Sequence, residues 1–226
     1  CTTLLADAGP AVTELIEPSG PVSATQVAAL RERILQALPR FGGVALCGTV
    51  PPGVPESFYG DIARAARQAG LLVALDGVTG VGPALTAGVS LLKVNAAELR
   101  ALSGLADLTA AARHCAERWA VPWTGVTDGP ATAWLFGRET TVRFDLPPLE
   151  GLRSTIGAGD CATGVLLQRL VGTDLNAATV SAAFAEALAA ASASCLTDTP
   201  AQFDPAVAAD LRRRLRVTAS TDGGIR

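Results

Sequence analysis

Short apolar runs alternate with segments of helical period over most of the chain, and this alternation constrains the fold more than any other feature. The runs expected to form strands cover residues 43–47, 71–75, 89–94 and 123–127. Between them apolar residues recur every three or four positions, which predicts helices over residues 25–38, 56–69, 82–87, 96–102 and 109–119. Strands joined through helices by short connections form a mostly parallel sheet with helices on both faces. The predicted fold class is therefore α/β.

The two ends of the chain depart from this alternation. Strand-prone runs at residues 1–5 and 12–16 flank the turn cluster Asp7-Ala8-Gly9-Pro10, which predicts a hairpin. A second hairpin is expected from residues 132–136 and 140–144, and after it the chain is mostly helical, over residues 160–170, 177–194 and 205–215. We expect one domain over residues 1–217 that includes the first hairpin (1–17), and a flexible tail of small and polar residues over 218–226.

The charge balance argues against a nucleic-acid partner. Eighteen Lys and Arg residues against 21 Asp and Glu residues give a formal net charge of −3, so the sequence lacks the clustered positive charge that binding to a phosphate backbone requires. The most apolar long window, residues 177–196, is mostly Ala and Ser and carries Glu186, which makes it too weakly apolar to span a bilayer. We therefore expect a soluble protein with no membrane partner.

The cysteines predict a reducing cytoplasm. They are odd in number, widely scattered and never paired at metal or redox spacing: Cys1, Cys47, Cys115, Cys161 and Cys195. We expect them to be buried as small apolar side chains. The N-terminus has no basic segment followed by an apolar stretch, so no secretory signal is predicted. The sequence contains no Met, and we expect the chain to be processed or to be a fragment.

The segment Thr155-Ile156-Gly157-Ala158-Gly159-Asp160 carries the sharpest chemical signal. Two glycines that flank an alanine let the backbone turn tightly and aim several N–H groups in one direction, where an apolar helix begins. The positive end of that helix would stabilise a phosphoryl group in transfer, and Asp160 could accept a hydroxyl proton as general base. The plainer alternative is a glycine turn with Asp160 as an ordinary helix cap.

A dinucleotide-binding fingerprint is a second alternative for the same residues. Gly157, Gly159 and Ala162 satisfy the pattern G-x-G-x-x-G/A. That fingerprint should follow an apolar strand and open a βαβ unit, whereas here polar residues 150–154 precede it and helices follow it. We therefore give this alternative little weight.

Four motifs in one order resemble the ribokinase-like (PfkB) carbohydrate kinases, and most closely their 1-phosphofructokinase and tagatose-6-phosphate kinase branch. The motifs are Gly48-Thr49-Val50-Pro51-Pro52-Gly53, Lys93-Val94-Asn95-Ala96-Ala97-Glu98, Thr127-Asp128-Gly129 and residues 155–160. Each motif alone is weak, but four in the order of the family are a strong signal. The resemblance covers essentially the whole chain and implies a ribokinase-like fold with a remnant of a β lid at the N-terminus.

The resemblance also implies roles for individual residues. Asp160 would be the catalytic base, and the anion hole for the γ-phosphate would be formed by Gly157, Ala158 and Gly159. The nucleotide site would include Lys93, Asn95, Thr127, Gly129 and Thr155. Glu98 would act through water on Mg²⁺, and Thr49 would approach the sugar. The implied nucleotide and metal are ATP and Mg²⁺.

Simpler interpretations compete with the assignments of Asn95, Glu98 and Lys93, and one further residue, His114, is given no role in the site. Asn95 and Glu98 are also an acceptable N-cap and N3 pair for the following helix. Lys93, at the end of a strand, would by default be a solvated charge. His114, the only histidine, lies in a helical, Ala-rich stretch and is interpreted as structural.

Departures from the family pattern are as informative as the matches. Thr132 stands where the family has a second glycine in its nucleotide loop, and Ser154 stands where Asp or Asn often precedes the threonine of the anion-hole motif. The family is also longer, and we expect the missing part to be N-terminal, with the first strand, its sugar-binding Asp and most of the lid.

The predicted function is an ATP-dependent kinase that phosphorylates a hydroxyl of a phosphorylated ketohexose of the fructose 1-phosphate or tagatose 6-phosphate type. Two alternatives stay open: a nucleotide-binding module without kinase activity, and a kinase for an unphosphorylated sugar or a nucleoside. The predicted partners are the sugar phosphate and ATP. A homodimer or other self-association is also predicted, because a sheet edge left open by a missing strand favours association.

Overall fold

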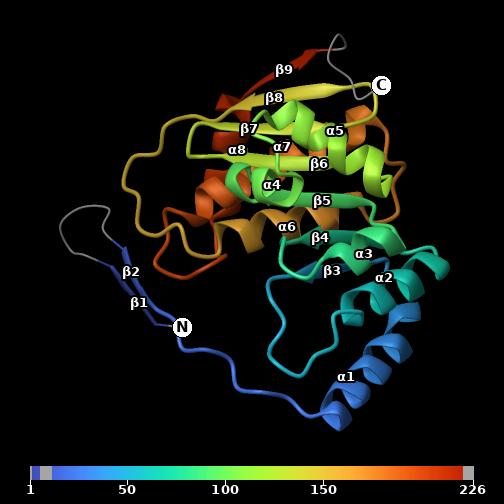
Figure 1. Ribbon diagram of the computed structural model, residues 1–226. Helices are drawn as coiled ribbons and strands as arrows, with labels where there is room; N and C mark the ends of the chain where they lie inside the picture. Colours follow the sequence, from blue (N-terminus) through green and yellow to red (C-terminus); the bar gives the residue numbers. More distant parts are fainter. Residues whose placement is uncertain (1, 6–11, 221–226) are drawn as a thin grey trace.

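A seven-stranded sheet forms the centre of the protein. The computed structural model describes residues 2–5 and 12–220 (Figure 1). The strands follow one another across the sheet in chain order: β3 (Gly43–Cys47), β4 (Leu72–Asp76), β5 (Leu91–Asn95), β6 (Thr124–Asp128), β7 (Thr132–Phe136), β8 (Thr141–Asp145) and β9 (Arg216–Ser220). The first four are parallel, and β7, β8 and β9 each pair antiparallel with the strand before. The predicted α/β class is confirmed, but the expected mostly parallel sheet is a mixed one, in which three strand pairs are parallel and three are antiparallel.

Helices cover both faces of this sheet (Figure 1). The larger apolar cluster packs one face under five helices, which are α1 (Ala24–Ala37), α2 (Phe58–Gln68), α3 (Gly82–Ala87), α4 (Ala96–Ser103) and α5 (Leu108–Trp119). The other face lies under α6 (Ala158–Leu170) and α7 (Ala177–Ser194), with α8 (Pro205–Arg214) packed on α7. Successive residues of a strand point to opposite faces of the sheet. In β4, Val73 therefore packs in the first cluster and Leu72 in the second.

Helix α7 is buried between its neighbours. The prediction that this stretch is too weakly apolar to span a bilayer is wrong, because Ala177–Ser194 is apolar enough by length and composition. However, 56% of the helix is buried inside the molecule. Phe184 from this helix lies edge-on to Phe144 of β8, with ring centroids 5.2 Å apart. The apolar character of α7 is therefore used in packing against the sheet and against α6 and α8.

The two chain ends test the predicted boundaries. The first hairpin is confirmed, since β1 (Thr2–Leu5) and β2 (Val12–Leu15) pair antiparallel, while Cys1 and the turn expected at residues 7–10 lie outside the described residues. The flexible tail predicted from residue 218 is wrong for residues 218–220, which belong to β9. The backbone of β8 offers an open edge, and the β-branched residues Val217 and Thr218 suit a strand there. Residues 221–226 also lie outside the described part.

Three of the four described cysteines are buried as predicted, and the fourth is not. Cys115, Cys161 and Cys195 are buried free thiols, and burial raises the pKa of Cys115 to about 11. Cys47 is exposed at the end of β3, so its predicted burial is wrong. The strand lies at the edge of the sheet, where only Leu46 is buried.

Gly125 on β6 should tolerate no side chain, because Phe184 of α7 occupies the space beside it. A Cβ added at Gly125 would lie 2.8 Å from Cε2 of Phe184. We expect Gly125→Ala to lower the free energy of unfolding by about 1–3 kcal/mol, as overpacked cores do. Urea denaturation followed by circular dichroism measures the change.

The matched control is Gly164→Ala in α6, where nothing lies within 4 Å of the added Cβ. That substitution should raise the free energy of unfolding by roughly 0.5–1 kcal/mol, because glycine weakens a helix interior. Equal effects of the two substitutions would contradict the proposed packing.

Candidate active site

The ends of four parallel strands bring most of the predicted site residues to one cavity. Parallel strands have their carboxyl ends at the same edge of a sheet, where ligands of such folds bind. The cavity there has a volume of about 450 Å³. The predicted residues that line it are Thr49, Lys93, Asn95, Glu98, Thr127, Gly157, Gly159 and Asp160.

Three predicted residues do not line this cavity. Gly129 lies in the turn between β6 and β7 with a positive φ of 70°, two positions after Thr127. Thr155 is exposed and its carbonyl accepts a hydrogen bond from the N–H of Ala158 at 3.3 Å. Ala158 is the first residue of α6. All three therefore lie within two positions of a residue that lines the cavity.

The start of α6 leaves backbone donors open toward the cavity. Gly157 is the N-cap and has a left-handed backbone (φ 77°), and no side chain caps the helix. The N–H groups of Gly159 and Asp160 fall in the first turn, where a helix offers them no acceptor. This end of the helix carries positive partial charge, so it suits an anion. Asp160, which is exposed, lies in the same turn.

A distant segment holds the glycine turn in place. A Cβ at Gly157 would lie 2.8 Å from the backbone nitrogen of Ala201, so only glycine fits. The N–H of Ser154 donates to the carbonyl of Cys195 at 3.2 Å, and the Ser154 hydroxyl accepts from the N–H of Ile156 at 3.2 Å. The turn is therefore fixed from both sides.

The dinucleotide alternative does not fit this arrangement. Residues 146–157 form no helix or strand between β8 and α6, so no strand leads directly into the glycine turn. Helix α6 is followed by α7 and α8 and by no parallel strand. The βαβ unit that the fingerprint requires is therefore missing from residues 141–220.

Lys93 is a buried cation and not a solvated one. Only 5% of it is exposed, and its ammonium donates to Oδ2 of Asp76 at 3.0 Å. The Thr163 hydroxyl donates to the same oxygen at 2.6 Å. A Cβ at Gly159 would lie 3.1 Å from Nζ of Lys93, so the ammonium lies directly beneath the first turn of α6.

Asn95 and Glu98 form the capping box of α4. The Asn95 side chain accepts from the N–H of Glu98 at 2.9 Å, and Oε2 of Glu98 accepts from the N–H of Asn95 at 2.8 Å. The capping interpretation is therefore confirmed. Because this pair also lines the cavity, the cap fixes the Glu98 carboxylate at its wall.

Six residues that line the cavity were not among the predicted site residues, and two of them, Asp76 and Cys47, have ionisable side chains. Asp76 closes the apolar strand β4, and a carboxylate at the carboxyl end of such a strand was the signal that could have identified it. Cys47 ends β3; although the residue is exposed at the surface, partial desolvation of its thiol, together with the nearby Asp76 and Asp160 carboxylates, raises its pKa to about 11. The Tyr59 hydroxyl donates to the carbonyl of Cys47 at 2.6 Å and fixes the end of that strand.

The donors of the cavity fit a hydrated Mg²⁺ rather than a metal held by protein ligands alone. The carboxylates of Asp76, Glu98 and Asp160 line it, and oxygen is the ligand that Mg²⁺ prefers. Within residues 2–5 and 12–220, no three His, Cys, Asp or Glu side chains gather closely enough to hold a metal. The cation would therefore keep waters and share phosphate oxygens, as Mg²⁺ does at kinase sites.

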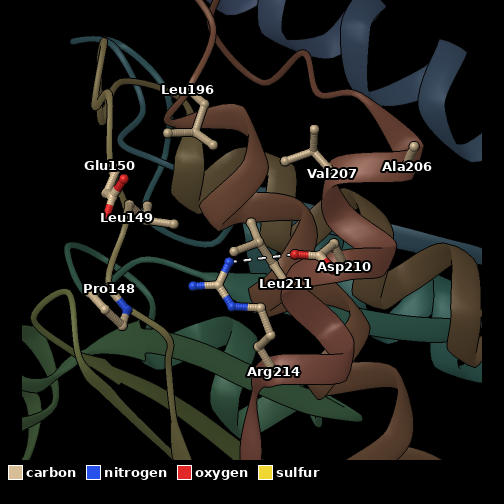
Figure 2. A pocket seen from close by; sticks show the side chains of 9 residues that line it. All are labelled: Pro148, Leu149, Glu150, Leu196, Ala206, Val207, Asp210, Leu211 and Arg214. Carbon is tan, nitrogen blue, oxygen red and sulfur yellow. Dashed lines mark hydrogen bonds and ion pairs between the residues drawn. The ribbon is translucent and has the colours of Figure 1, made fainter.

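A larger cavity of about 600 Å³ lies elsewhere, between α8 and residues 148–150 (Figure 2). Its apolar wall includes Leu149, Val207 and Leu211, and Arg214 points to Asp210 at 3.4 Å. None of the predicted site residues lines it. The smaller cavity at the strand ends is therefore the candidate active site.

Comparison with known sequences identifies the family. The model of the pfkB family carbohydrate kinases matches residues 2–204. A 1-phosphofructokinase from Rhodobacter capsulatus is 37% identical over 175 residues, which are 73% of this chain and 54% of that protein. The ATP-dependent 6-phosphofructokinase isozyme 2 of Mycobacterium tuberculosis is 31% identical over 54% of this chain and 38% of its own length. The matched stretch thus spans about half, or less, of these relatives.

Solved structures agree on the fold. Phosphofructokinase-2 from Escherichia coli superposes with a TM-score of 0.80 at 21% identity, over 94% of this chain and 69% of that one. A possible 1-phosphofructokinase from Thermotoga maritima gives a TM-score of 0.78 at 18% identity, over 96% and 69% of the two chains. The ribokinase-like fold expected from the motifs is confirmed by these neighbours. The family model, which matches residues 2–204, establishes that the chain belongs to the pfkB family of carbohydrate kinases.

Proposed function

We propose that this protein is an ATP-dependent sugar-phosphate kinase that transfers the γ-phosphate of ATP to a hydroxyl of a phosphorylated ketohexose. The observation that carries the proposal is the position of Asp160 in the open first turn of α6, above the buried ammonium of Lys93. A carboxylate beside an anion site is the arrangement that phosphoryl transfer to a hydroxyl requires.

The names of the relatives support a phosphorylated ketohexose as acceptor. The two curated relatives are named 1-phosphofructokinase and ATP-dependent 6-phosphofructokinase isozyme 2. The E. coli phosphofructokinase-2 neighbour was also solved in complex with fructose-6-phosphate, at 21% identity to this chain. Fructose 1-phosphate and fructose 6-phosphate are accordingly the first acceptors to assay, together with the tagatose 6-phosphate that the motif resemblance implies. Thr49, at the wall of the cavity, would approach the sugar.

In the proposed reaction the acceptor oxygen attacks the γ-phosphorus, the bond to the β-phosphate oxygen breaks, and ADP leaves. Asp160 takes the proton of the acceptor hydroxyl on its carboxylate. The N–H groups of Gly157 and Gly159 would donate to the equatorial oxygens of the phosphoryl group, joined by that of Ala158 once it leaves the carbonyl of Thr155. Backbone donors held in this way need no reorganisation as charge moves, which is why they are effective.

The nucleotide would lie along the ends of β5 and β6. The Lys93 ammonium has three N–H donors, and Asp76 is its one acceptor within the described residues, so two donors are left for phosphate oxygens. Asn95 and Thr127 lie side by side in the register of β5 and β6 at the cavity. Gly129 and Thr155 would contact the nucleotide from the flanking turns. Mg²⁺, when bound, would neutralise charge on the phosphates, with Glu98 reaching it through water.

Asp160→Asn should abolish most of the turnover and leave nucleotide binding nearly intact. An amide cannot accept the proton, and a general base contributes about 10²–10⁴-fold to the rate. We expect kcat with fructose 1-phosphate or tagatose 6-phosphate to fall by that factor. A coupled assay for ADP measures kcat, and calorimetric titration measures ATP affinity.

The control is Asp174→Asn, which removes an exposed carboxylate between α6 and α7 and should leave kcat unchanged. A kcat for Asp160→Asn within a few-fold of the parent would reject the assigned base. Binding of MgATP by the parent without transfer to any ketohexose phosphate would reject the kinase and favour a nucleotide-binding module.

Glu98→Gln should separate the metal role of this residue from its capping role. A glutamine carbonyl can still accept the N–H of Asn95, so α4 keeps its cap, but the negative charge is lost. We expect the Mg²⁺ concentration for half-maximal activity to rise roughly 10–100-fold, as for other outer-shell metal partners. Thermal unfolding should stay near that of the parent. An unchanged Mg²⁺ requirement would remove Glu98 from the metal site.

Self-association is also part of the proposal. Leu4, Leu15 and Ile16 of the β1–β2 region are 54%, 58% and 71% exposed, and large apolar side chains left in solvent favour contact with another copy. A tetrameric inhibited form of E. coli phosphofructokinase-2 is known among the structural neighbours. We expect sedimentation velocity to detect oligomers that Ile16→Lys weakens and Leu105→Lys, a control at another exposed site, does not. A monodisperse monomer at high concentration would contradict this.

A further inference from the structure

A single carboxylate oxygen joins three elements beneath the start of α6. Oδ2 of Asp76, at the end of β4, accepts from the ammonium of Lys93 on β5 at 3.0 Å and from the hydroxyl of Thr163 on α6 at 2.6 Å. The side chains of Lys93 and Asp76 are only 7% and 15% exposed. A charge pair with so little water around it depends on every donor that it has.

Thr163 is placed to transmit this interaction to the reacting groups. It lies one helical turn after Asp160, so the two residues are neighbours along one face of α6. The ammonium that shares Oδ2 with Thr163 lies against Gly159 of the first turn. A shift of the Asp76 carboxylate would therefore move the cation beneath the same N–H groups that face the cavity.

The hydroxyl of Thr163 has one hydrogen and two acceptors within reach. The carbonyl of Gly159, four residues earlier in the helix, is 3.1 Å away, whereas Oδ2 of Asp76 is 2.6 Å away. A hydrogen bond to a carboxylate is shorter and stronger than one to a neutral carbonyl. The hydrogen is therefore donated to Asp76, across elements that are 87 positions apart in sequence.

We propose that Thr163 is a positioning residue for phosphoryl transfer. Its hydroxyl fixes the Asp76 carboxylate, which holds the Lys93 ammonium under the first turn of α6, so that the cation, the open N–H groups and Asp160 all face the terminal phosphates. The inference rests on the proposed function, because it assigns those groups to a nucleotide triphosphate. It predicts that the hydroxyl matters for the β- and γ-phosphates and not for the rest of the nucleotide.

The test compares Thr163→Val, which keeps the shape and removes the hydroxyl, with Thr163→Ser, which keeps the hydroxyl. Calorimetric titrations with MgATP and with AMP are made on the full chain, well below the unfolding temperature of each variant. We expect Thr163→Val to bind MgATP at least 10-fold more weakly and AMP within twofold of the parent, and Thr163→Ser to restore MgATP binding to within threefold. Thr163→Ala replaces the valine variant if that protein does not fold.

The control is Thr173→Val near the other end of α6. The Thr173 hydroxyl donates to the carbonyl of Leu170 at 2.9 Å, so its removal also costs one hydrogen bond of a threonine to this helix. This variant should lose stability without a change in MgATP affinity. A loss of MgATP affinity equal to that of Thr163→Val would overturn the positioning role, because the effect would then be one of general stability.

Hydrogen exchange provides a readout that does not depend on nucleotide binding. We expect the amides of residues 161–163, whose N–H groups are hydrogen-bonded within α6, to exchange at least 10-fold faster in Thr163→Val than in the parent or in Thr163→Ser, with α7 unchanged. If the parent fails to bind MgATP, the proposed function fails, and hydrogen exchange alone then tests whether the Thr163 hydroxyl holds the start of α6 in place. If the parent binds MgATP while Thr163→Val binds as tightly and exchanges as slowly, the inference about Thr163 is overturned and the proposed kinase stands.

Discussion

The parallel alignment of β3, β4, β5 and β6 places the candidate site. Each strand ends at the same edge of the sheet, and each supplies a cavity residue at or next to its end: Cys47, Asp76, Asn95 and Thr127. Parallel strands are joined by helices on the faces, which leaves that edge open for a ligand. The start of α6 then closes over the edge from the second face. The direction of these strands thus determines where on the sheet the candidate site lies.

Most of the secondary structure could be predicted because local and tertiary preferences agree. Residues 132–136 and 177–194 have the bounds expected from their patterns, and Ser23 caps α1 with Gln26 as its partner. The exception is β9, whose five residues are all exposed. Because neither face of β9 is buried, its sequence has no alternation of apolar and polar residues that would predict a strand. The strand is held in place by its hydrogen bonds with β8.

The candidate site was predictable only where one segment carries the chemistry. The glycine turn before Asp160 and the Asn95–Glu98 cap each lie within a few residues, so their roles can be inferred from spacing. The environment of Lys93 is not local, because its partner Asp76 is 17 positions away and Thr163 is 87 positions from Asp76. Residues so far apart in the sequence leave no periodic pattern from which their contact could be predicted. The same limit applies to Cys47, whose exposure follows from the position of β3 at the sheet edge.

The support of Gly157 by Ala201 has a consequence for which parts of the chain can vary in length. Connections between helices usually accept insertions, because they run over the surface with few contacts. Residues 195–202 are different: the carbonyl of Cys195 accepts from Arg153 and Ser154, and the Thr197 hydroxyl lies within hydrogen-bonding distance of the carbonyls of Thr199 and Gln202. One residue inserted in this stretch would displace the backbone of Ala201, which already lies against the glycine turn at Gly157. The stretch after α7 therefore has little freedom to change in length, although it carries none of the proposed reacting groups.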